Sequence, residues 1–192
     1  YGFTPETIPA MFIPNTYDFY WNTSGDKFLD KMSEENKKFW NFERKEKAKQ
    51  AGFTESEIVT LASIVDEETD NEAEMPKIAG MYINRLHMNM PLQADPTIKF
   101  ATKNFTAHRI YQKWLTIDNP YNTYKYRGLP PGPIRIPSVA AIDAVLNYVH
   151  HDYIYMCAKE DFSGTHNFAK TYEEHQVNAA KYAKALNEHG IN

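Results

Sequence analysis

The sequence predicts an α+β fold, a helix-dominated domain with a small antiparallel β-hairpin and long loops that contain proline. Thr54 with Glu57 and Thr171 with Glu174 are two capping boxes, and each of them opens a helix. Short runs rich in strand-forming residues near the end of the chain predict the hairpin. Most prolines lie between these segments and indicate loops.

The predicted elements follow one another with clear start signals. Residues 1–23 mix prolines with aromatic residues and are expected to be extended. Helices follow these residues. Each begins with a serine or threonine at its N-cap or with a proline at its first position, which are residues that helix starts favour. They are expected at 24–51, 54–68, 76–90, 138–149 and 171–188. The strands are expected at Tyr153–Ala158 and Thr165–Phe168, and residues 92–137 are expected to be rich in loops.

Composition describes a globular protein and excludes several other classes. A chain of 192 residues fits one domain, or one domain with a small appended lobe. Apolar residues make up 42% and charged residues 24%, which excludes a disordered chain. The net charge is −4 and the basic residues are scattered, so no nucleic-acid partner is expected. Cys157 is the single cysteine, and no apolar run is long enough to cross a bilayer.

A carboxylate at the end of the 54–68 helix is a candidate for chemistry. Apolar residues recur along that helix at the spacing of one buried face, at Ile58, Leu61, Ala62 and Val65. Glu67 falls opposite this face and should lie in water, Glu68 falls near its edge, and Asp66 lies on the other flank. A carboxyl group held against apolar surface has a raised pKa and can serve as a general acid near neutral pH. Helix geometry favours Glu68 over Asp66 only modestly.

Two other interpretations of this acidic segment stay open on these grounds. A run of acidic residues is also typical of a solvated or capping helix end. A calcium loop built from the acidic residues at positions 66 to 74 is the second interpretation. It fits less well, because the segment lacks the glycine and the alternating Asp or Asn residues of a known calcium loop.

Polar residues downstream are candidates to accompany this carboxylate. Asn84 lies in the predicted 76–90 helix, and Gln93 and Asp95 follow it. Because Gln93 and Asp95 alternate, an extended segment would point both to one side. Asp-Pro-Thr sequences are also common turn chemistry, so this segment alone is weak.

Two later segments add hydrogen-bonding groups. Tyr121–Tyr124 precedes the stiff Gly128–Pro133 loop, which could hold a cleft wall at low entropic cost. His166 and Phe168 alternate and so share one face of a predicted strand. A single histidine on a strand is more often structural than functional.

Together and in this order, these motifs resemble the YceG-like family. The motifs are Ala62-Ser-Ile-Val-x-x-Glu68-Thr69, Asn84-Arg85-Leu86, Leu92-Gln-x-Asp95-Pro96-Thr97, Tyr121-Asn-Thr-Tyr124, Gly128-Leu-Pro-Pro-Gly132 and His166-x-Phe168. The resemblance runs from about Phe12 to the terminal helix. It implies one catalytic domain over residues 1–192, with a leading loop and helix at 1–52 and the active-site region at 53–192.

The resemblance also implies an activity. Members of this family are endolytic murein transglycosylases, which cleave the bond between N-acetylmuramic acid and N-acetylglucosamine within nascent peptidoglycan strands. They leave anhydromuramic ends and have a role in terminating strand elongation. In this sequence the family's catalytic glutamate maps to Glu68, acting as general acid and then as base, with no cofactor and no metal. The residues expected to bind substrate or orient Glu68 are Asn84, Gln93, Asp95, Thr97, Asn122, Thr123, Tyr124 and His166.

Two alternatives remain beside the transglycosylase. A hydrolase would use Glu68 together with Asp95, because ordinary glycosidases place two carboxylates about the scissile bond. A peptidoglycan-binding module would hold glycan without cleaving it.

Membership in the family would place the intact protein in the bacterial cell envelope. Relatives usually carry a single-pass anchor in the cytoplasmic (inner) membrane and a small LysM-like lobe, with the catalytic domain on the extracytoplasmic side. We expect neither the anchor nor the lobe in this chain, so membrane contact would come only through the missing anchor. Peptidoglycan strands and cell-wall synthases are the implied partners. Residues 103–118 match no motif and receive no predicted role.

Overall fold

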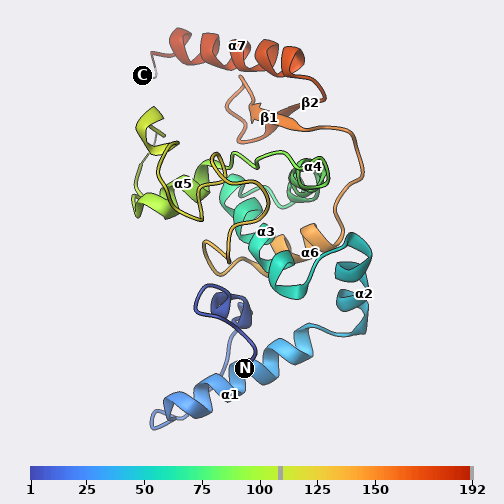
Figure 1. Cartoon of the computed structure of the whole chain (residues 1–192), viewed down its shortest axis with the longest axis vertical. Helices are drawn as coiled ribbons and strands as arrows, with labels where there is room; N and C mark the ends of the chain where they lie inside the picture. The colour runs from blue at the N-terminus through green and yellow to red at the C-terminus, as the bar shows by residue number, and fades with distance from the viewer. Residues whose placement is uncertain (108–109, 191–192) are drawn as a thin grey trace.

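The computed structural model describes residues 1–107 and 110–190 of the chain. The elements in that part are η1 (Ile8–Met11), α1 (Gly25–Phe39), α2 (Phe42–Ala51), α3 (Glu55–Glu68), α4 (Met75–His87), α5 (Asp95–Thr102), η2 (Gln112–Trp114), α6 (Val139–Leu146), β1 (Tyr155–Ala158), β2 (His166–Ala169) and α7 (Tyr172–Glu188). Helices α1 and α7 lie at opposite ends of the long axis, with α3 between them (Figure 1). The predicted class, a helix-dominated α+β fold with one small antiparallel sheet, is therefore confirmed.

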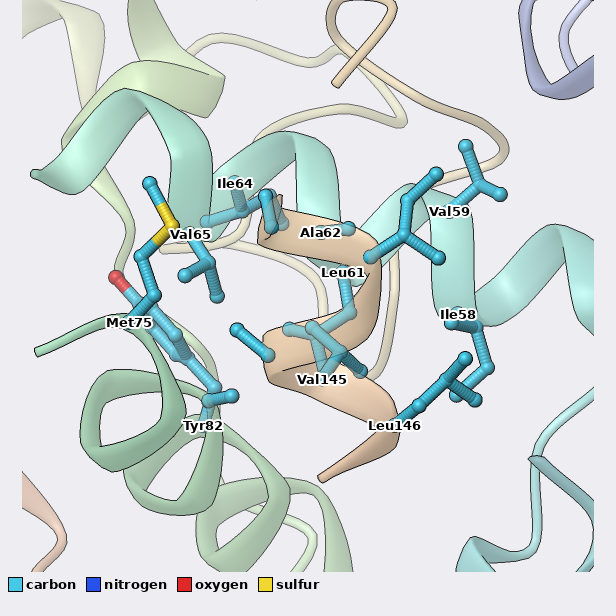
Figure 2. Close-up of a cluster of buried hydrophobic side chains, with 14 of the residues drawn as sticks. Ile58, Val59, Leu61, Ala62, Ile64, Val65, Met75, Tyr82, Val145 and Leu146 are labelled. Carbon is cyan, nitrogen blue, oxygen red and sulfur yellow. The ribbon is translucent and has the colours of Figure 1, made fainter. Parts of the chain in front are cut away.

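Helix α3 is the centre of the core. Its predicted capping box forms, because the backbone N–H of Glu57 donates to the Thr54 hydroxyl and the Glu57 carboxylate accepts from the backbone N–H of Thr54. Figure 2 shows the apolar side chains of α3 packed against those of α4 and α6, among them Leu61 and Val145, which are fully buried. Burial of each large aliphatic side chain stabilises the fold by about 1.5–3 kcal/mol. Helix α3 is thus held firmly where its last turn ends.

The β-hairpin lies between the core and α7 (Figure 1). Strands β1 and β2 are antiparallel, with Met156 paired to Phe168, and both of these side chains pack against the core. On the other side, the Tyr155 ring meets those of Tyr172 and His175 from α7, with centroids 5.9 and 5.3 Å apart. The second predicted capping box forms at the start of α7. The hairpin therefore joins α7 to the core.

The single helix expected at 24–51 is wrong, because the chain forms two helices there. Trp40 ends α1 with its side chain buried to 2% exposure, which turns the chain toward the core. Asn41 then starts α2, since its side chain accepts a hydrogen bond from the backbone N–H of Arg44 at 3.0 Å. A new N-cap and one buried aromatic side chain interrupt the helical periodicity at this point.

Two other predicted helices end earlier than expected, each because a backbone group bonds elsewhere. Helix α4 stops at His87, where Asn89 takes a left-handed conformation and the backbone N–H of Met90 donates to the carbonyl of Arg85. Helix α6 stops at Leu146, and the backbone N–H of Val149 donates to the carbonyl of Pro76 at 3.0 Å.

The extended conformation expected for Gln93 and Asp95 is also wrong. Asp95 is the first residue of α5, and Pro96 follows it in the first turn, where proline is tolerated. Gln93 has a φ of +52°, so the chain turns sharply before the helix begins. Residues 108 and 109 of the unassigned 103–118 stretch lie outside the described part of the chain. Among the described residues, no helix has the length and apolar character that crossing a membrane requires.

Candidate active site

Glu68 is the last residue of α3 and lies half-buried at the wall of a cavity of about 330 Å³. Its Oε1 accepts a hydrogen bond of 2.5 Å from the hydroxyl of Tyr82, which comes from α4. Tyr82 packs in the core cluster with its ring buried, as Figure 2 shows. The second carboxylate oxygen of Glu68, Oε2, has no hydrogen-bond partner in the described part of the chain and is not among its buried unpaired atoms. Oε2 is therefore accessible and is the oxygen that is free to exchange a proton.

The surroundings of Glu68 favour its protonated form. Burial raises the pKa of the Glu68 carboxyl from its ordinary 4.5 to about 7, and the negative charge of Asp95 adds to the rise. The hydrogen bond from Tyr82 opposes this rise by stabilising the charged form, as does the nearby Lys99 and, when its ring is protonated, His166. A carboxyl group with a pKa near neutrality can donate a proton and later accept one. The prediction of a raised pKa at this helix end is confirmed.

The two acidic neighbours of Glu68 have structural partners on another side of α3. Asp66 accepts a hydrogen bond of 2.6 Å from the hydroxyl of Ser138, the N-cap of α6. Glu67 is exposed, as predicted, and pairs with Arg135 at 2.7 Å. Of these three acidic residues, Glu68 is the one that lines the 330 Å³ cavity.

The cavity wall is made by residues of α3, α4, the start of α5, β1, β2 and α7, and by loop residues before α5 and after η2. Its lining residues are Glu68, Met81, Tyr82, Arg85, Leu92, Gln93, Asp95, Tyr124, Tyr155, Met156, Cys157, Ala158, His166, Tyr172 and His175. Four of the predicted substrate-binding residues, Gln93, Asp95, Tyr124 and His166, are therefore brought together with Glu68. Glu68 also borders a second hollow of about 520 Å³, formed with residues 67–71 and the hairpin turn at Ser163 and Gly164.

Asp95 and Tyr124 are joined to each other on the cavity wall. The Tyr124 hydroxyl donates to Oδ1 of Asp95 at 2.5 Å. Burial raises the pKa of the Tyr124 hydroxyl above its ordinary value, and the bond to Asp95 raises it further, so this hydroxyl stays a donor. Asp95 thus supplies a fixed negative charge near Glu68.

Three other predicted residues lie behind this wall and do not line the cavity. Thr97, Asn122 and Thr123 are buried, with 0 to 2% of their surface exposed. The hydroxyls of Thr97 and Thr123 are 2.8 Å apart, and Thr123 also accepts from the backbone N–H of Ala94 at 3.0 Å. The amide group of Asn122 donates to the carbonyls of Leu115 and Ile117. These side chains hold together the loops that carry Asp95 and Tyr124.

Asn84 also lies away from the cavity. Its amide group donates to the carbonyls of His151 and Tyr153 at 2.6 and 3.0 Å, which ties α4 to the segment before β1. The Gly128–Pro133 loop does not form a wall of this cavity either. Leu129, Pro130 and Pro131 line a separate hollow of about 380 Å³, so this loop is part of a cleft wall, but not at Glu68.

Arg85 belongs to the Asn84-Arg85-Leu86 motif and has no predicted role, yet its contacts organise the cavity. It is only 6% exposed, and its guanidinium donates to the carbonyls of Ile154, Pro91 and Leu92 at 2.6 to 3.1 Å. Burial lowers the pKa of Arg85 from its ordinary value. This one side chain therefore fixes β1 relative to the turn that carries Gln93. The sequence signal that could have indicated this role is the presence of a charged residue, Arg85, on the apolar side of its helix.

Tyr82 and Glu74 were missed for different reasons. Tyr82 has no predicted role, because helical spacing can put a residue on the apolar face of a helix but does not show which group its hydroxyl contacts. Glu74 was considered only as a calcium ligand, whereas its carboxylate is bound by His166, 92 residues away. Within residues 1–107 and 110–190, no three His, Cys, Asp or Glu side chains are grouped as a metal site requires.

Comparison with known proteins shows similarity across the chain. The model of the YceG-like family matches residues 3–181. An endolytic murein transglycosylase of Bacillus subtilis is 41% identical over 131 residues, which are 68% of this chain and 36% of that protein. One of Streptococcus pneumoniae (strain R6) is 31% identical over 185 residues, which are 93% of this chain and 33% of that protein.

A crystal structure of a yceG-like protein from Listeria monocytogenes has the same fold. It superposes with a TM-score of 0.77 at 30% sequence identity, covering 88% of this chain and 54% of that one. The chain spans about a third of the length of the transglycosylases it matches, 36% and 33%. Because the family model matches residues 3–181, which is nearly the whole chain, this chain belongs to the YceG-like family.

Proposed function

We propose that this chain is the catalytic part of a lytic transglycosylase that cleaves peptidoglycan within its glycan strands. The observation that carries the proposal is the carboxyl of Glu68, a residue that lines the cavity, with a pKa of about 7 and one free oxygen. The similarity to proteins named endolytic murein transglycosylases supports the choice of substrate. We also propose that it has a role in terminating strand elongation.

The reaction needs one group that is first an acid and then a base. Protonated Glu68 donates its proton to the glycosidic oxygen between N-acetylmuramic acid and N-acetylglucosamine, and the bond breaks through an oxocarbenium-like state. The resulting carboxylate accepts the proton of the muramic 6-hydroxyl, whose oxygen forms a bond to C1 of its own ring. Glu68 ends the cycle protonated, and no water is consumed. Because Tyr82 occupies Oε1, both proton transfers take place at Oε2.

The cavity favours this intramolecular attack. A sugar held against the wall brings its own hydroxyl to C1 with the advantage of proximity. Gln93, Tyr124 and His166 line the cavity and are the proposed substrate contacts, whereas Thr97, Asn122 and Thr123 act indirectly by holding the loops in place.

Hydrolysis is the second candidate, and one observation favours it. Asp95 lies in the same cavity as Glu68, so a second carboxylate is at hand to activate water. The hydrogen bond from Tyr124 to Asp95 argues for a different role, because it engages one of the oxygens that would bind that water. In the proposed mechanism Asp95 helps to keep Glu68 protonated by its negative charge.

The cellular setting follows from the substrate. We place the protein in the bacterial cell envelope, with the catalytic domain on the extracytoplasmic side of the cytoplasmic membrane. The intact protein would be anchored there by a single membrane-spanning helix outside this chain, close to the synthases that make the glycan strand.

Matched variants of two neighbouring glutamates test the catalytic assignment. Purified glycan strands are incubated with the wild-type chain, with Glu68→Gln and with Glu67→Gln, and released fragments are measured by chromatography. We expect Glu68→Gln to release none and Glu67→Gln to behave as the wild type, because Glu67 pairs with Arg135 outside the cavity. Cleavage by Glu68→Gln would remove Glu68 from the mechanism. If wild type and Glu68→Gln bound glycan equally and neither released product, the chain would be a binding module.

A further inference from the structure

Glu74 and His166 form a pair that the acid–base chemistry of Glu68 does not require. Oε1 of Glu74 accepts the backbone N–H of His166 at 2.8 Å, and Oε2 lies 2.8 Å from Nδ1 of the same residue. The two side chains are only 11% and 13% exposed. Glu74 directly precedes α4 and His166 opens β2, so the pair links two elements of the cavity wall. Two bonds to one residue fix both the place and the rotation of the imidazole ring.

This arrangement selects one form of the ring. An ionised carboxylate has only acceptors, so the proton between Oε2 of Glu74 and the imidazole sits on Nδ1. In the neutral imidazole the other nitrogen, Nε2, then carries a lone pair and accepts hydrogen bonds. A buried carboxylate is a common device for setting which ring nitrogen of a histidine is protonated.

His166 borders the cavity. It is one of the lining residues, and its partner Glu74 is not. In the described part of the chain, Nε2 of His166 has no hydrogen-bond partner and is not among the buried atoms that lack one. Nε2 of His166 is thus a hydrogen-bond acceptor without a donor from the protein. A bound ligand can supply that donor.

We propose that Glu74 is a positioning residue that holds His166 as a hydrogen-bond acceptor for a hydroxyl or acetamido N–H of the sugar bound beside Glu68. The inference rests on the proposed function, because it takes the ligand of the cavity to be a glycan. His166 is then a binding contact that is made equally in the ground state and in the transition state. Loss of such a contact raises KM and changes kcat little.

Glu74→Gln tests the role of the carboxylate with little change in size. The amide has one oxygen and one NH₂ group, so it cannot accept both N–H groups of His166. With its oxygen on the backbone N–H, the NH₂ group donates to Nδ1 and the ring proton moves to Nε2, which becomes a donor. Nitrogen-15 NMR of the imidazole, recorded at a pH where the ring is neutral, distinguishes the two forms. We expect the proton on Nδ1 in the wild type and on Nε2 in Glu74→Gln.

Kinetics on purified glycan strands test the role of His166. His166→Asn keeps a donor near the position of Nδ1, and so keeps the bond to Glu74, but has no atom at the position of Nε2. We expect KM to rise about tenfold in both His166→Asn and Glu74→Gln, with kcat within about threefold of the wild type, the change expected for one lost hydrogen bond. Glu160→Gln is the matched control, because Glu160 bonds Asn167 of the same strand and does not line the cavity.

Either of two results would overturn the proposal. The first is a wild-type ring protonated on Nε2, which would remove the acceptor. The second is a KM in His166→Asn that equals that of the Glu160→Gln control, which would mean that substrate does not use Nε2. If the wild-type chain cleaved no glycan, the proposed function would fail. In that case the NMR comparison would still decide whether Glu74 sets the form of the ring.

Discussion

Deletion of one hydroxyl group, in Tyr82→Phe, should move the pH range in which the protein is active. The Tyr82 hydroxyl donates to Oε1 of Glu68 at 2.5 Å inside the core, and this bond lowers the pKa of the carboxyl. Burial outweighs the bond, and the pKa is about 7. Without the bond, the charged form of Glu68 loses a stabilising partner while its burial is unchanged. The pKa of Glu68 must therefore rise.

The size of the shift follows from the energy of the bond. A hydrogen bond to a charged group contributes about 1.5–3 kcal/mol, and each pKa unit corresponds to about 1.4 kcal/mol. Part of the bond persists when Glu68 is protonated, so we expect a rise of about one unit. The protonated acid starts the reaction, so activity is present below the pKa of Glu68 and is lost above it. The alkaline limb of kcat/KM should therefore move up by about one pH unit in Tyr82→Phe.

The assay is cleavage of glycan strands across the pH range, with Tyr17→Phe as the matched control. The Tyr17 hydroxyl also donates a hydrogen bond, to the carbonyl of Ile13 at 2.7 Å, but it lies outside the cavity. The control should keep the alkaline limb of the wild type. An alkaline limb in Tyr82→Phe that stays in place, or moves to lower pH, would refute the claim that this limb reports the Glu68 carboxyl.

Three further predictions concern stability. The folded pKa of Glu68 lies above its ordinary 4.5, so its contribution to stability is full below that pH and is lost as the pH rises through about 7. Relative to the wild type, Glu68→Gln should gain about 2 kcal/mol in free energy of unfolding between about pH 4 and pH 8, by urea titration. An equal difference at both pH values would contradict this. Asp66→Asn should lose about 1–3 kcal/mol because it weakens the contact with Ser138; a stable but inactive variant would show a catalytic role instead. Gly132→Ala should lose about 1–3 kcal/mol, since its Cβ would lie 2.0 Å from the carbonyl oxygen of Glu6. An unchanged melting temperature would exclude that clash.

Sequence patterns predicted the parts of the fold that depend on local chemistry. Both capping boxes and the hairpin are examples, because a cap or a strand pair is decided by a few neighbouring residues. The break between α1 and α2 depended on burial of Trp40, which is a tertiary effect. The position of Glu68 at the edge of a buried helix face was also predictable, because it depends only on the spacing of residues within one helix.

The rest of the site depends on pairs that are distant in sequence. Tyr82 meets Glu68 from the next helix, and His166 meets Glu74 across 92 residues of sequence. The hydrophobic periodicity of a sequence does not reveal contacts between residues of different elements. A motif match also does not separate a residue that touches a ligand from one that supports it. Thr123 and Asp95 belong to neighbouring motifs, yet Thr123 is buried behind the wall and Asp95 lies on it.

The origin of the oxygen at the newly formed sugar end tests the central claim most directly. Glycan strands are cleaved by the wild-type chain in water enriched in oxygen-18, and the new muramic ends are analysed by mass spectrometry. If Glu68 acts alone and the muramic 6-hydroxyl attacks C1, the ends are anhydro sugars without the heavy isotope. Reducing muramic ends that carry one oxygen-18 atom would show that water is the nucleophile, which would contradict attack by the muramic 6-hydroxyl.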